Sequence, residues 1–190
     1  LGTKNTDIYI GNSKANRYSG GDGNDLMDGG LGNDRLFGRD GDDTLIGGEG
    51  NDALEGGAGN DRLIDASTTS NDVFVWGRGM GADILSDAGG IDRLDIQAGV
   101  TADQLWLNKA DDDLVVSIIG TSDSFTVRDW FASASNQVES LRLSDGKALM
   151  ASQVQALVDT MASLTPPAAG QSALPTDQLA LKALVATSWS

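Results

Sequence analysis

Five aspartates follow one another at intervals of nine residues, and each is the sixth residue of a nonapeptide whose first and fourth residues are glycine. These nonapeptides fill residues 20–64 without a gap, and their aspartates are Asp25, Asp34, Asp43, Asp52 and Asp61. Glycine is used where the backbone adopts positive φ or passes close to another group. A loop of this form turns several carbonyl oxygens toward one point and adds a carboxylate, and Ca²⁺ takes roughly six to eight such oxygen ligands. The spacing therefore predicts calcium ions bound by the repeat loops.

An apolar residue stands two positions after each of these aspartates. The five residues are Met27, Leu36, Leu45, Leu54 and Leu63. The middle side chain of a short strand points to one face, so stacked repeats would line these residues into one narrow core. A nine-residue period with this composition is typical of a β-solenoid.

The nonapeptide frame extends in degenerate form on both sides of the regular repeats. Backwards, two further units place Asp7 and Asn16 at the sixth position. Forwards, Asp72, Asp83 and Asp92 follow at intervals of 11, 11 and 9 residues, each with an apolar residue two positions later. We expect the solenoid to continue in these degenerate turns to about residue 96.

The repeats carry more negative charge than their own side chains can neutralise. Residues 20–64 contain 11 acidic and 3 basic residues, so facing loops repel one another unless cations lie between them. We therefore expect this segment to be unfolded without calcium. A disordered acidic linker and a metal-free β-helix are alternatives, although disorder does not require an apolar residue at every ninth position. An EF-hand is excluded, because no Asp-x-Asp-x-Asp-Gly loop is followed by Glu at its twelfth position.

The repeats of residues 20–64 resemble the glycine-rich nonapeptides of the RTX (repeats-in-toxin) family of type I secreted bacterial proteins. Four later segments resemble the part that closes RTX blocks in adenylate cyclase toxin-haemolysins and related large exoproteins. They are NDVFVWG (71–77), ADQLW (102–106), IGT (119–121) and VRDWF (127–131). The ending, with a helix, a stretch rich in Pro and Ala and a last Trp189, is similar to the end of those toxins.

The resemblance implies an all-β fold, a calcium-bound parallel β-roll with a C-terminal β cap and a short terminal helix. In such a roll, one turn comprises two nonapeptides, so loops on the same side are 18 residues apart. One loop lends carbonyls from positions two and four plus its Asp, and the next lends carbonyls from positions one and three plus its Asp. Between about three and five Ca²⁺ ions are implied.

Three central sites follow when this arrangement is carried over residue by residue. The first comprises Gly21, Gly23 and Asp25 with Gly38, Asp40 and Asp43. The second comprises Gly30, Gly32 and Asp34 with Gly47, Glu49 and Asp52. The third comprises Arg39, Gly41 and Asp43 with Gly56, Ala58 and Asp61.

Departures from the family pattern weaken the outer sites. Arg39 replaces a position-two glycine, which is expected to strain its loop while keeping the carbonyl. Asn16 replaces an aspartate, so a site that uses it is doubtful. The outer candidates are a site joining Asp7 to Gly20, Asp22 and Asp25, a pair Asp61 and Asp83, and a pair Asp72 and Asp92.

Composition excludes several other kinds of site. The 190 residues include no Cys and no His, and the formal charge is −15. Disulfides, zinc bound through thiolates and affinity for nucleic acid are therefore not indicated. An enzyme is disfavoured, because there is no His for a triad and no Gly-x-Ser-x-Gly motif. We expect a monomer.

The ends of the sequence suggest a piece of something longer. No N-terminal signal peptide and no apolar run of 18 residues is present, so neither Sec-type export nor membrane spanning is indicated. The sequence begins within a repeat frame, which suggests that it was excised from a longer protein. A membrane or cell-surface target reached through an N-terminal part of that protein stays open.

Residues 97–150 change to half-buried β-structure, with strands expected at 105–107, 114–119, 124–127 and 138–143. A solenoid exposes its last turn and needs a cap. We interpret this segment as that cap, with a core of Trp106, Phe125, Trp130 and Phe131. An aromatic platform for sugars is the alternative.

The C-terminal segment, residues 151–190, is predicted to start with a helix. Ser152 and Gln155 form a capping-box pattern, and Pro166 and Pro167 end the helix. Its apolar face comprises Val154, Leu157, Val158, Met161 and Leu164. Residues 165–190 would read as a frayed tail, whereas the resemblance implies an uncleaved type I secretion signal with an apolar face of Leu179, Leu181, Leu184 and Val185.

Together these features divide the chain into a β-roll at 1–96, a cap at 97–150 and a helix with secretion signal at 151–190. The resemblance implies a secreted bacterial protein whose repeats are unfolded at low calcium and fold on export, with the type I secretion machinery as partner. An adhesive or polysaccharide-binding module is the alternative, since RTX repeats also occur in surface adhesins and carbohydrate-modifying enzymes.

Overall fold

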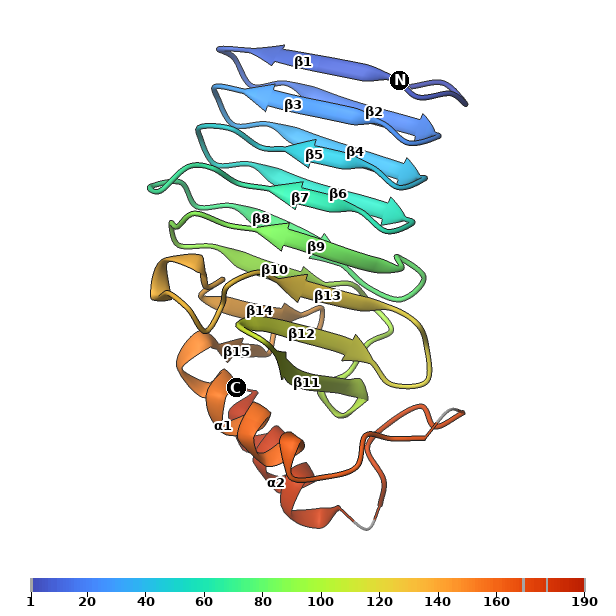
Figure 1. The fold of residues 1–190 in the computed structure, drawn as a ribbon, viewed down its shortest axis with the longest axis vertical. Helices are drawn as coiled ribbons and strands as arrows, with labels where there is room; N and C mark the ends of the chain where they lie inside the picture. Colours follow the sequence, from blue (N-terminus) through green and yellow to red (C-terminus); the bar gives the residue numbers. More distant parts are fainter. Residues whose placement is uncertain (1, 169, 177, 190) are drawn as a thin grey trace.

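Two β-sheets face each other along the long axis of the protein, and the chain winds between them coil by coil (Figure 1). The computed structural model describes residues 2–168, 170–176 and 178–189. The first sheet has the order β1 (Ile8–Asn12), β3 (Leu26–Gly30), β5 (Thr44–Ile46), β7 (Arg62–Ile64), β9 (Ala82–Ser86), β13 (Ser124–Val127), β12 (Asp113–Ile118) and β11 (Leu105–Ala110). The second has the order β2 (Arg17–Asp22), β4 (Arg35–Asp40), β6 (Ala53–Ala58), β8 (Val73–Trp76), β10 (Arg93–Ile96), β14 (Ser140–Leu143) and β15 (Ala148–Met150).

Successive coils pair in parallel with a register of two nonapeptides. Met27 is opposite Leu45 and Leu45 is opposite Leu63 in the first sheet, while Leu36 is opposite Leu54 in the second. All five of these side chains are 0% exposed. The prediction of a parallel β-roll whose eighth-position residues form the core is therefore confirmed.

The degenerate repeats keep this register although their spacing is stretched. Leu63 is opposite Leu85, and Leu54 is opposite Phe74. Phe74 and Leu85 are again 0% exposed. The inserted residues lie in the connecting loops, because a shift within a strand would move its apolar side chain to the other face.

The segment after β10 extends both sheets and also turns them back. β13 pairs in parallel with β9, and β14 pairs in parallel with β10, so each sheet gains one more roll-like strand. Beyond them β12, β11 and β15 pair antiparallel. The short 3₁₀ helices η1 (Ala102–Gln104) and η2 (Ala134–Asn136) lie in the connections. Trp106, Phe125 and Trp130 are buried in this region, as expected, and Phe131 is half-buried.

Helix α1 (Ala151–Ala162) follows β15 directly and covers the end of the molecule beside β11 (Figure 1). It buries Val154, Leu157, Val158 and Met161, which confirms most of the predicted apolar face. The predicted capping box is wrong, because the N-cap residue is Met150, two residues before Ser152, and Ser152 lies within the first turn. The Gln153 side chain instead accepts a 3.0 Å hydrogen bond from the Met150 N–H.

Residues 165–190 contain a second helix, α2 (Leu179–Ser188), which packs against α1 and η1. Leu181 and Val185 are buried, whereas Leu179 is 73% exposed. The apolar residues expected to form one face are therefore divided between the protein interior and solvent. Within the described residues, no helix combines the length and the apolar character needed to cross a bilayer.

Candidate metal centre

The loops that precede the strands are stacked in two columns, one on each side of the roll. First-side loops lead into the first sheet and include residues 20–25, 38–43 and 56–61. Second-side loops lead into the second sheet and include residues 29–34, 47–52 and 65–72. Neighbouring loops in a column are one coil apart, so residues that are distant in sequence can bind the same cation.

A ladder of hydrogen bonds holds the sixth-position carboxylates in each column. The backbone N–H of each sixth-position residue donates to Oδ1 of the aspartate one coil later. On the first side the pairs are Asp7–Asp25 (2.7 Å), Asp25–Asp43 (2.7 Å), Asp43–Asp61 (2.8 Å) and Asp61–Asp83 (2.9 Å). On the second side they are Asn16–Asp34 (2.5 Å), Asp34–Asp52 (2.7 Å), Asp52–Asp72 (2.5 Å) and Asp72–Asp92 (2.7 Å). One oxygen of each carboxylate is thereby fixed.

The second oxygen, Oδ2, has no such support in most of the loop aspartates. In the part of the chain that the structure describes, Oδ2 is buried without a hydrogen-bond partner in eight aspartates: Asp25, Asp34, Asp43, Asp52, Asp61, Asp83, Asp87 and Asp92. Leaving a buried charged oxygen unpaired is costly. A column of such oxygens indicates that a cation belongs there, since buried charges are normally paired or coordinate metals.

Three of the partnerless oxygens lie close to a carbonyl oxygen beside a position-one glycine. A Cβ atom placed on Gly29 would lie 2.5 Å from both Asp34 Oδ2 and the Gly47 carbonyl oxygen. On Gly20 it would lie 2.7 Å from the Gly38 carbonyl oxygen and would overlap Asp25 Oδ2. A side chain at position one would therefore fill the space where the two oxygens converge.

The third central pair repeats this arrangement. A Cβ atom placed on Gly38 would overlap both Asp43 Oδ2 and the Gly56 carbonyl oxygen. The three converging pairs join the same loops that the three sequence-derived sites join. The donor set of carboxylates and carbonyls fits a hard cation such as Ca²⁺.

Positions two and four turn their backbone into the left-handed region. Gly21 and Gly23 have φ of 109° and 108°, and Gly30 and Gly32 have 90° and 110°. Arg39 occupies position two with φ of 94°, a conformation that is rare for a residue with a side chain.

Arg39 also makes contacts on the outer surface. Its Nε donates to Ser19 Oγ at 3.2 Å, and its guanidinium lies 5.4 Å from the centroid of the Phe37 ring. The backbone strain expected from the sequence is thus present, and the carbonyl remains available for the third site.

The position-three residues contribute through their backbone. The carbonyls of Asp40, Glu49 and Ala58 accept hydrogen bonds of 2.8 Å from the position-four N–H groups of the preceding coil. Their side chains are exposed. Since a carbonyl oxygen has two lone pairs, each can still be a cation ligand, and side-chain identity at position three is free to vary.

The outer candidates differ at the two ends of the roll. Asp7 Oδ2 accepts hydrogen bonds from Thr3 N–H (2.8 Å) and Thr3 Oγ1 (2.9 Å), so its loop satisfies that oxygen by itself. Asp22 is exposed and pairs with Lys4 at 3.8 Å. The structure therefore provides less support for a site joining Asp7 to Gly20, Asp22 and Asp25 than for the central sites.

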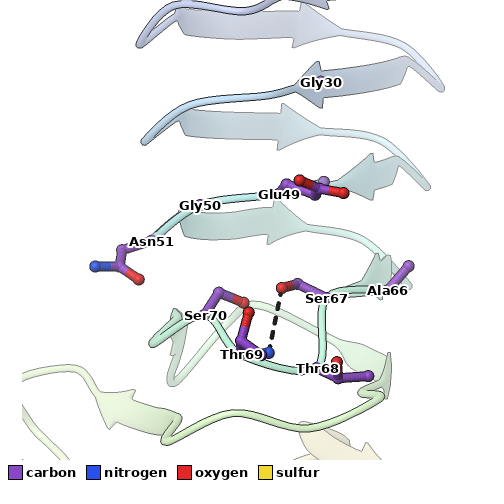
Figure 2. Close-up of a pocket in the computed structure, with 10 residues that line it drawn as sticks. Gly30, Glu49, Gly50, Asn51, Ala66, Ser67, Thr68, Thr69 and Ser70 are labelled. Atoms are coloured by element: carbon purple, nitrogen blue, oxygen red, sulfur yellow. Dashed lines mark hydrogen bonds between the residues drawn. The ribbon is translucent and has the colours of Figure 1, made fainter.

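Beyond the regular repeats, the second-side column opens into a polar hollow of about 510 Å³ (Figure 2). The loop with two inserted residues forms one wall through residues 66–70, and Gly48, Glu49, Gly50 and Asn51 form the other. Ser67 Oγ accepts a 3.4 Å hydrogen bond from the Thr69 N–H within that loop. The hydrogen-bond ladder continues from Asp52 to Asp72 although the loop between them is longer.

Burial changes the proton affinity of the stacked carboxylates. Desolvation raises the pKa of Asp43 and Asp52 to about 6, of Asp61 to about 7 and of Asp83 to about 8. Neighbouring carboxylates raise these pKa values further, while the ladder hydrogen bonds lower them. In the folded loops, these carboxylates are therefore stabilised by bound protons or by bound cations.

Three acidic residues of the column were missed by following only the sixth position. Asp65 and Asp87 occupy the first position of degenerate units, where the regular repeats have glycine. Glu139, directly before β14, accepts a 2.5 Å hydrogen bond from the Asp92 N–H and so continues the ladder into the cap. The signal for Asp87 was available, because it precedes Asp92 by the same five residues that separate Gly20 from Asp25, and Asp65 follows the position-one Gly56 by nine residues.

The stacked loops and two-sheet coil define a calcium-binding parallel β-roll. The family of RTX calcium-binding nonapeptide repeats (4 copies) matches residues 1–36, 10–45 and 28–63. The haemolysin-type calcium binding protein related domain matches residues 113–153. These two matches support a calcium-binding block of the RTX family, and the resemblance found in the sequence is confirmed. RTX repeats are typical of secreted bacterial proteins, and the β-roll is a structural calcium-binding module.

Proposed function

We propose that this calcium-binding module couples type I export of a larger bacterial protein to folding outside the cell. In the cytosol, where free calcium is scarce, the repeats stay unfolded and pass through a narrow secretion channel. Outside, calcium binds the loops and the roll forms. The observation that carries this proposal is the pair of columns of buried, partnerless aspartate oxygens.

The size of the calcium effect is sufficient for such a switch. A site occupied at 100 times its Kd stabilises the folded state by about 2.7 kcal/mol, so three central sites contribute about 8 kcal/mol. Native domains are stable by only about 5–15 kcal/mol in total. Binding energy of this size decides whether the roll is folded, because the unfolded repeats do not hold preformed sites.

The cap provides the folded end on which the coils assemble. It contains large buried aromatic residues, including Trp106, Phe125 and Trp130. Its strands β13 and β14 present parallel edges to β9 and β10. If export begins with the C-terminus, the cap emerges first and successive coils add toward the N-terminus, as one-dimensional stacking allows.

The C-terminal segment supplies the address for the type I secretion machinery. In the folded chain Leu181 and Val185 pack inward, so the machinery reads this segment before the chain folds. A target on a membrane or cell surface belongs to parts of the parent protein outside this chain. For the chain itself we propose a monomer that does not bind nucleic acid. We also propose a non-catalytic role, because its buried carboxylates bind calcium.

The alternative of a sugar-binding cap has less support. Trp106, Phe125 and Trp130 are 7%, 0% and 1% exposed. A ring stacked in a core offers no face to a sugar, so these aromatics serve packing.

The test is a calcium titration followed by far-UV circular dichroism, with magnesium as the control cation. We expect a cooperative rise of β signal with calcium and little response to magnesium. An Asp111→Asn variant, which changes an exposed carboxylate in the β11–β12 turn, should behave like the wild type. β-Structure that persists unchanged in excess chelator would overturn the proposal.

A further inference from the structure

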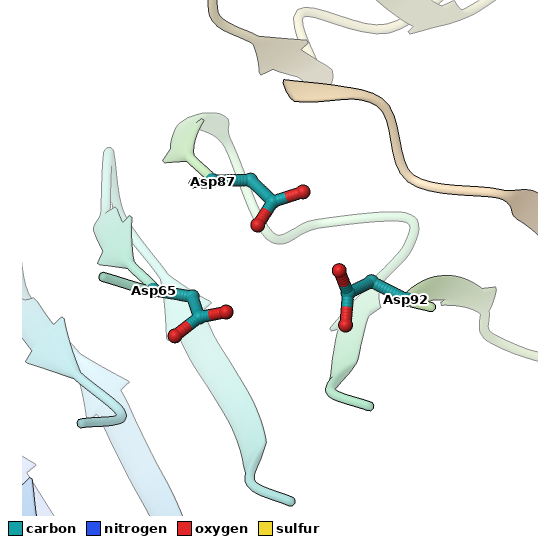
Figure 3. A group of neighbouring side chains, drawn as sticks. All are labelled: Asp65, Asp87 and Asp92. Atoms are coloured by element: carbon teal, nitrogen blue, oxygen red, sulfur yellow. The ribbon is translucent and has the colours of Figure 1, made fainter. Parts of the chain in front are cut away.

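Three buried carboxylates come together where the roll meets the cap (Figure 3). Asp65 directly follows β7, Asp87 directly follows β9, and Asp92 directly precedes β10. Each offers an oxygen that lies within 4.8 Å of the other two. Their exposed fractions are 3%, 8% and 1%. No other group of three or more metal-ligating side chains occurs among the described residues.

Two oxygens of this cluster have no hydrogen-bond donor among the described residues. Asp87 Oδ2 and Asp92 Oδ2 are buried and have no hydrogen-bond partner among the described residues. Figure 3 shows the carboxylates of Asp65, Asp87 and Asp92 arranged around one common space. None of the ion pairs found in the described part of the chain involves these residues. Two buried, unpartnered carboxylate oxygens aimed at a third carboxylate indicate a missing cation.

The cluster differs in construction from the repeat sites. In the repeats, position one is glycine, and a Cβ there would fill the space shared by a carboxylate and a carbonyl. At the junction, Asp65 and Asp87 stand at position one and bring their own carboxylates. The loop that holds Asp65 is longer, since the ladder step from Asp52 to Asp72 spans 20 residues and the regular step spans 18, whereas the loop from Asp87 to Asp92 keeps the regular length.

The surrounding hydrogen bonds hold two of the carboxylates in place. Ser70 Oγ donates to Asp72 Oδ2 at 2.6 Å and is also within 3.3 Å of Asp65 Oδ2. The Ser67 N–H donates to Asp65 Oδ1 at 2.9 Å. The Gly89 N–H donates to Asp87 Oδ1 at 3.1 Å. Each of these bonds leaves lone pairs free for a cation, because a carboxylate oxygen can accept more than one contact.

We propose that Asp65, Asp87 and Asp92 form a further Ca²⁺ site, bound by side chains and distinct from the three central nonapeptide sites. Ligand oxygens around Ca²⁺ lie at about 2.3–2.6 Å, so those on opposite sides are about 5 Å apart. Oxygens within 4.8 Å of one another fit around one such ion. Three carboxylates offer up to six oxygens, and water completes the shell.

The site joins the last coil to the cap. The Asp92 N–H donates to Glu139 Oε2 at 2.5 Å, and the Glu139 N–H donates back to the Asp92 carbonyl at 3.0 Å. Glu139 directly precedes β14, which pairs with β10. An ion held by Asp92 therefore fixes the end of the roll against the cap strand. This role, though not the binding itself, rests on the calcium-driven folding proposed above.

Crystals of the wild-type chain grown with calcium provide the direct test. We expect an anomalous-difference peak among Asp65, Asp87 and Asp92, in addition to peaks between the repeat loops. Density without a peak at the junction would overturn the site. A junction peak in a chain whose β-structure is indifferent to chelator would uphold the site and reject the proposed folding switch.

Ion counting with variants provides the second test. Equilibrium dialysis should find one Ca²⁺ fewer per chain in Asp87→Asn and in Asp65→Asn, and no change in the exposed control Asp111→Asn. Circular dichroism at saturating calcium verifies that each variant is folded. An unchanged count in a folded variant contradicts the proposal. If Asp87→Asn does not fold, the count in Asp65→Asn and the wild-type anomalous peak decide the question.

Discussion

Asp43 holds the centre of the first-side column, and replacing it with Asn tests the calcium argument most sharply. Its Oδ1 accepts the ladder bond from Asp25 at 2.7 Å, and its Oδ2 is buried without a partner in the described structure. The same residue belongs to both the first and the third central sites. Asn keeps the shape and the ladder acceptor, but it removes the charge and can turn an N–H₂ group toward the cation.

The loss of two sites sets the magnitude. At calcium concentrations of about 100 times Kd, each site contributes about 2.7 kcal/mol, so Asp43→Asn should lower the free energy of unfolding by about 5 kcal/mol. For a chain of this length that corresponds to a fall in Tm of about 10–20 °C. In excess chelator the difference should vanish, because neither protein then holds ions.

Thermal unfolding by circular dichroism, with and without calcium, measures both quantities. Asp34→Asn, which interrupts only one of the central sites, should lose about half as much at the same calcium level. Asp111→Asn controls for the chemical change at an exposed position. Two results would refute this reasoning: Asp43→Asn binds as many calcium ions as the wild type, or its loss in free energy of unfolding is the same with chelator as with calcium. In either case the carboxylate serves only the hydrogen-bond ladder.

Two further predictions concern strain and protons. Arg39→Gly should raise the free energy of unfolding of the calcium-loaded chain by about 1 kcal/mol, as measured by urea unfolding. The reason is that φ is 94° at this position, and a left-handed backbone costs a residue with a side chain about 1–2 kcal/mol. An unchanged or lower free energy of unfolding would show that the contacts of Arg39 with Ser19 and Phe37 outweigh the strain. In calcium-free buffer, acidification should favour folding. Burial raises the pKa of Asp61 to about 7 and of Asp83 to about 8, above their unfolded values, so their stabilising contribution is complete below about pH 4 and is lost as the pH rises to about 8. The β signal in calcium-free buffer should therefore increase from pH 8 to pH 4, and a decrease over this range would contradict the burial of these carboxylates.

The repeats were predictable because each position has a local physical reason. The period places Leu45 inward, the sixth position places Asp43 in the loop, and positive φ accounts for glycine at positions two and four. Periodicity alone left the pairing of coils open, and the two-nonapeptide register came from the family resemblance. The structure supports that register through the ladder bond between Asp25 and Asp43.

The cap could be predicted only in part. Its strands are recognisable from alternating apolar residues, but their partners are not. β13 pairs with β9 across a connection that includes β10, β11 and β12, and no repeat in the sequence specifies that pairing. Asp65 and Asp87 were missed for a related reason. They depart from the glycine pattern, and only the geometry reveals that their carboxylates converge with that of Asp92.

The two ends of the roll differ in a way that favours assembly from the cap. At the N-terminal end, Asp7 Oδ2 is satisfied by two hydrogen bonds from Thr3, so little is gained there by a cation. At the cap end, Asp83, Asp87 and Asp92 keep partnerless oxygens in the described structure, and Glu139 ties Asp92 to the cap strand. Because an aspartate such as Asp43 takes part in two sites, an ion bound nearer the cap orients a carboxylate that the next site needs. We therefore expect calcium to fill the columns from the cap toward the N-terminus, with each coil adding to one already ordered.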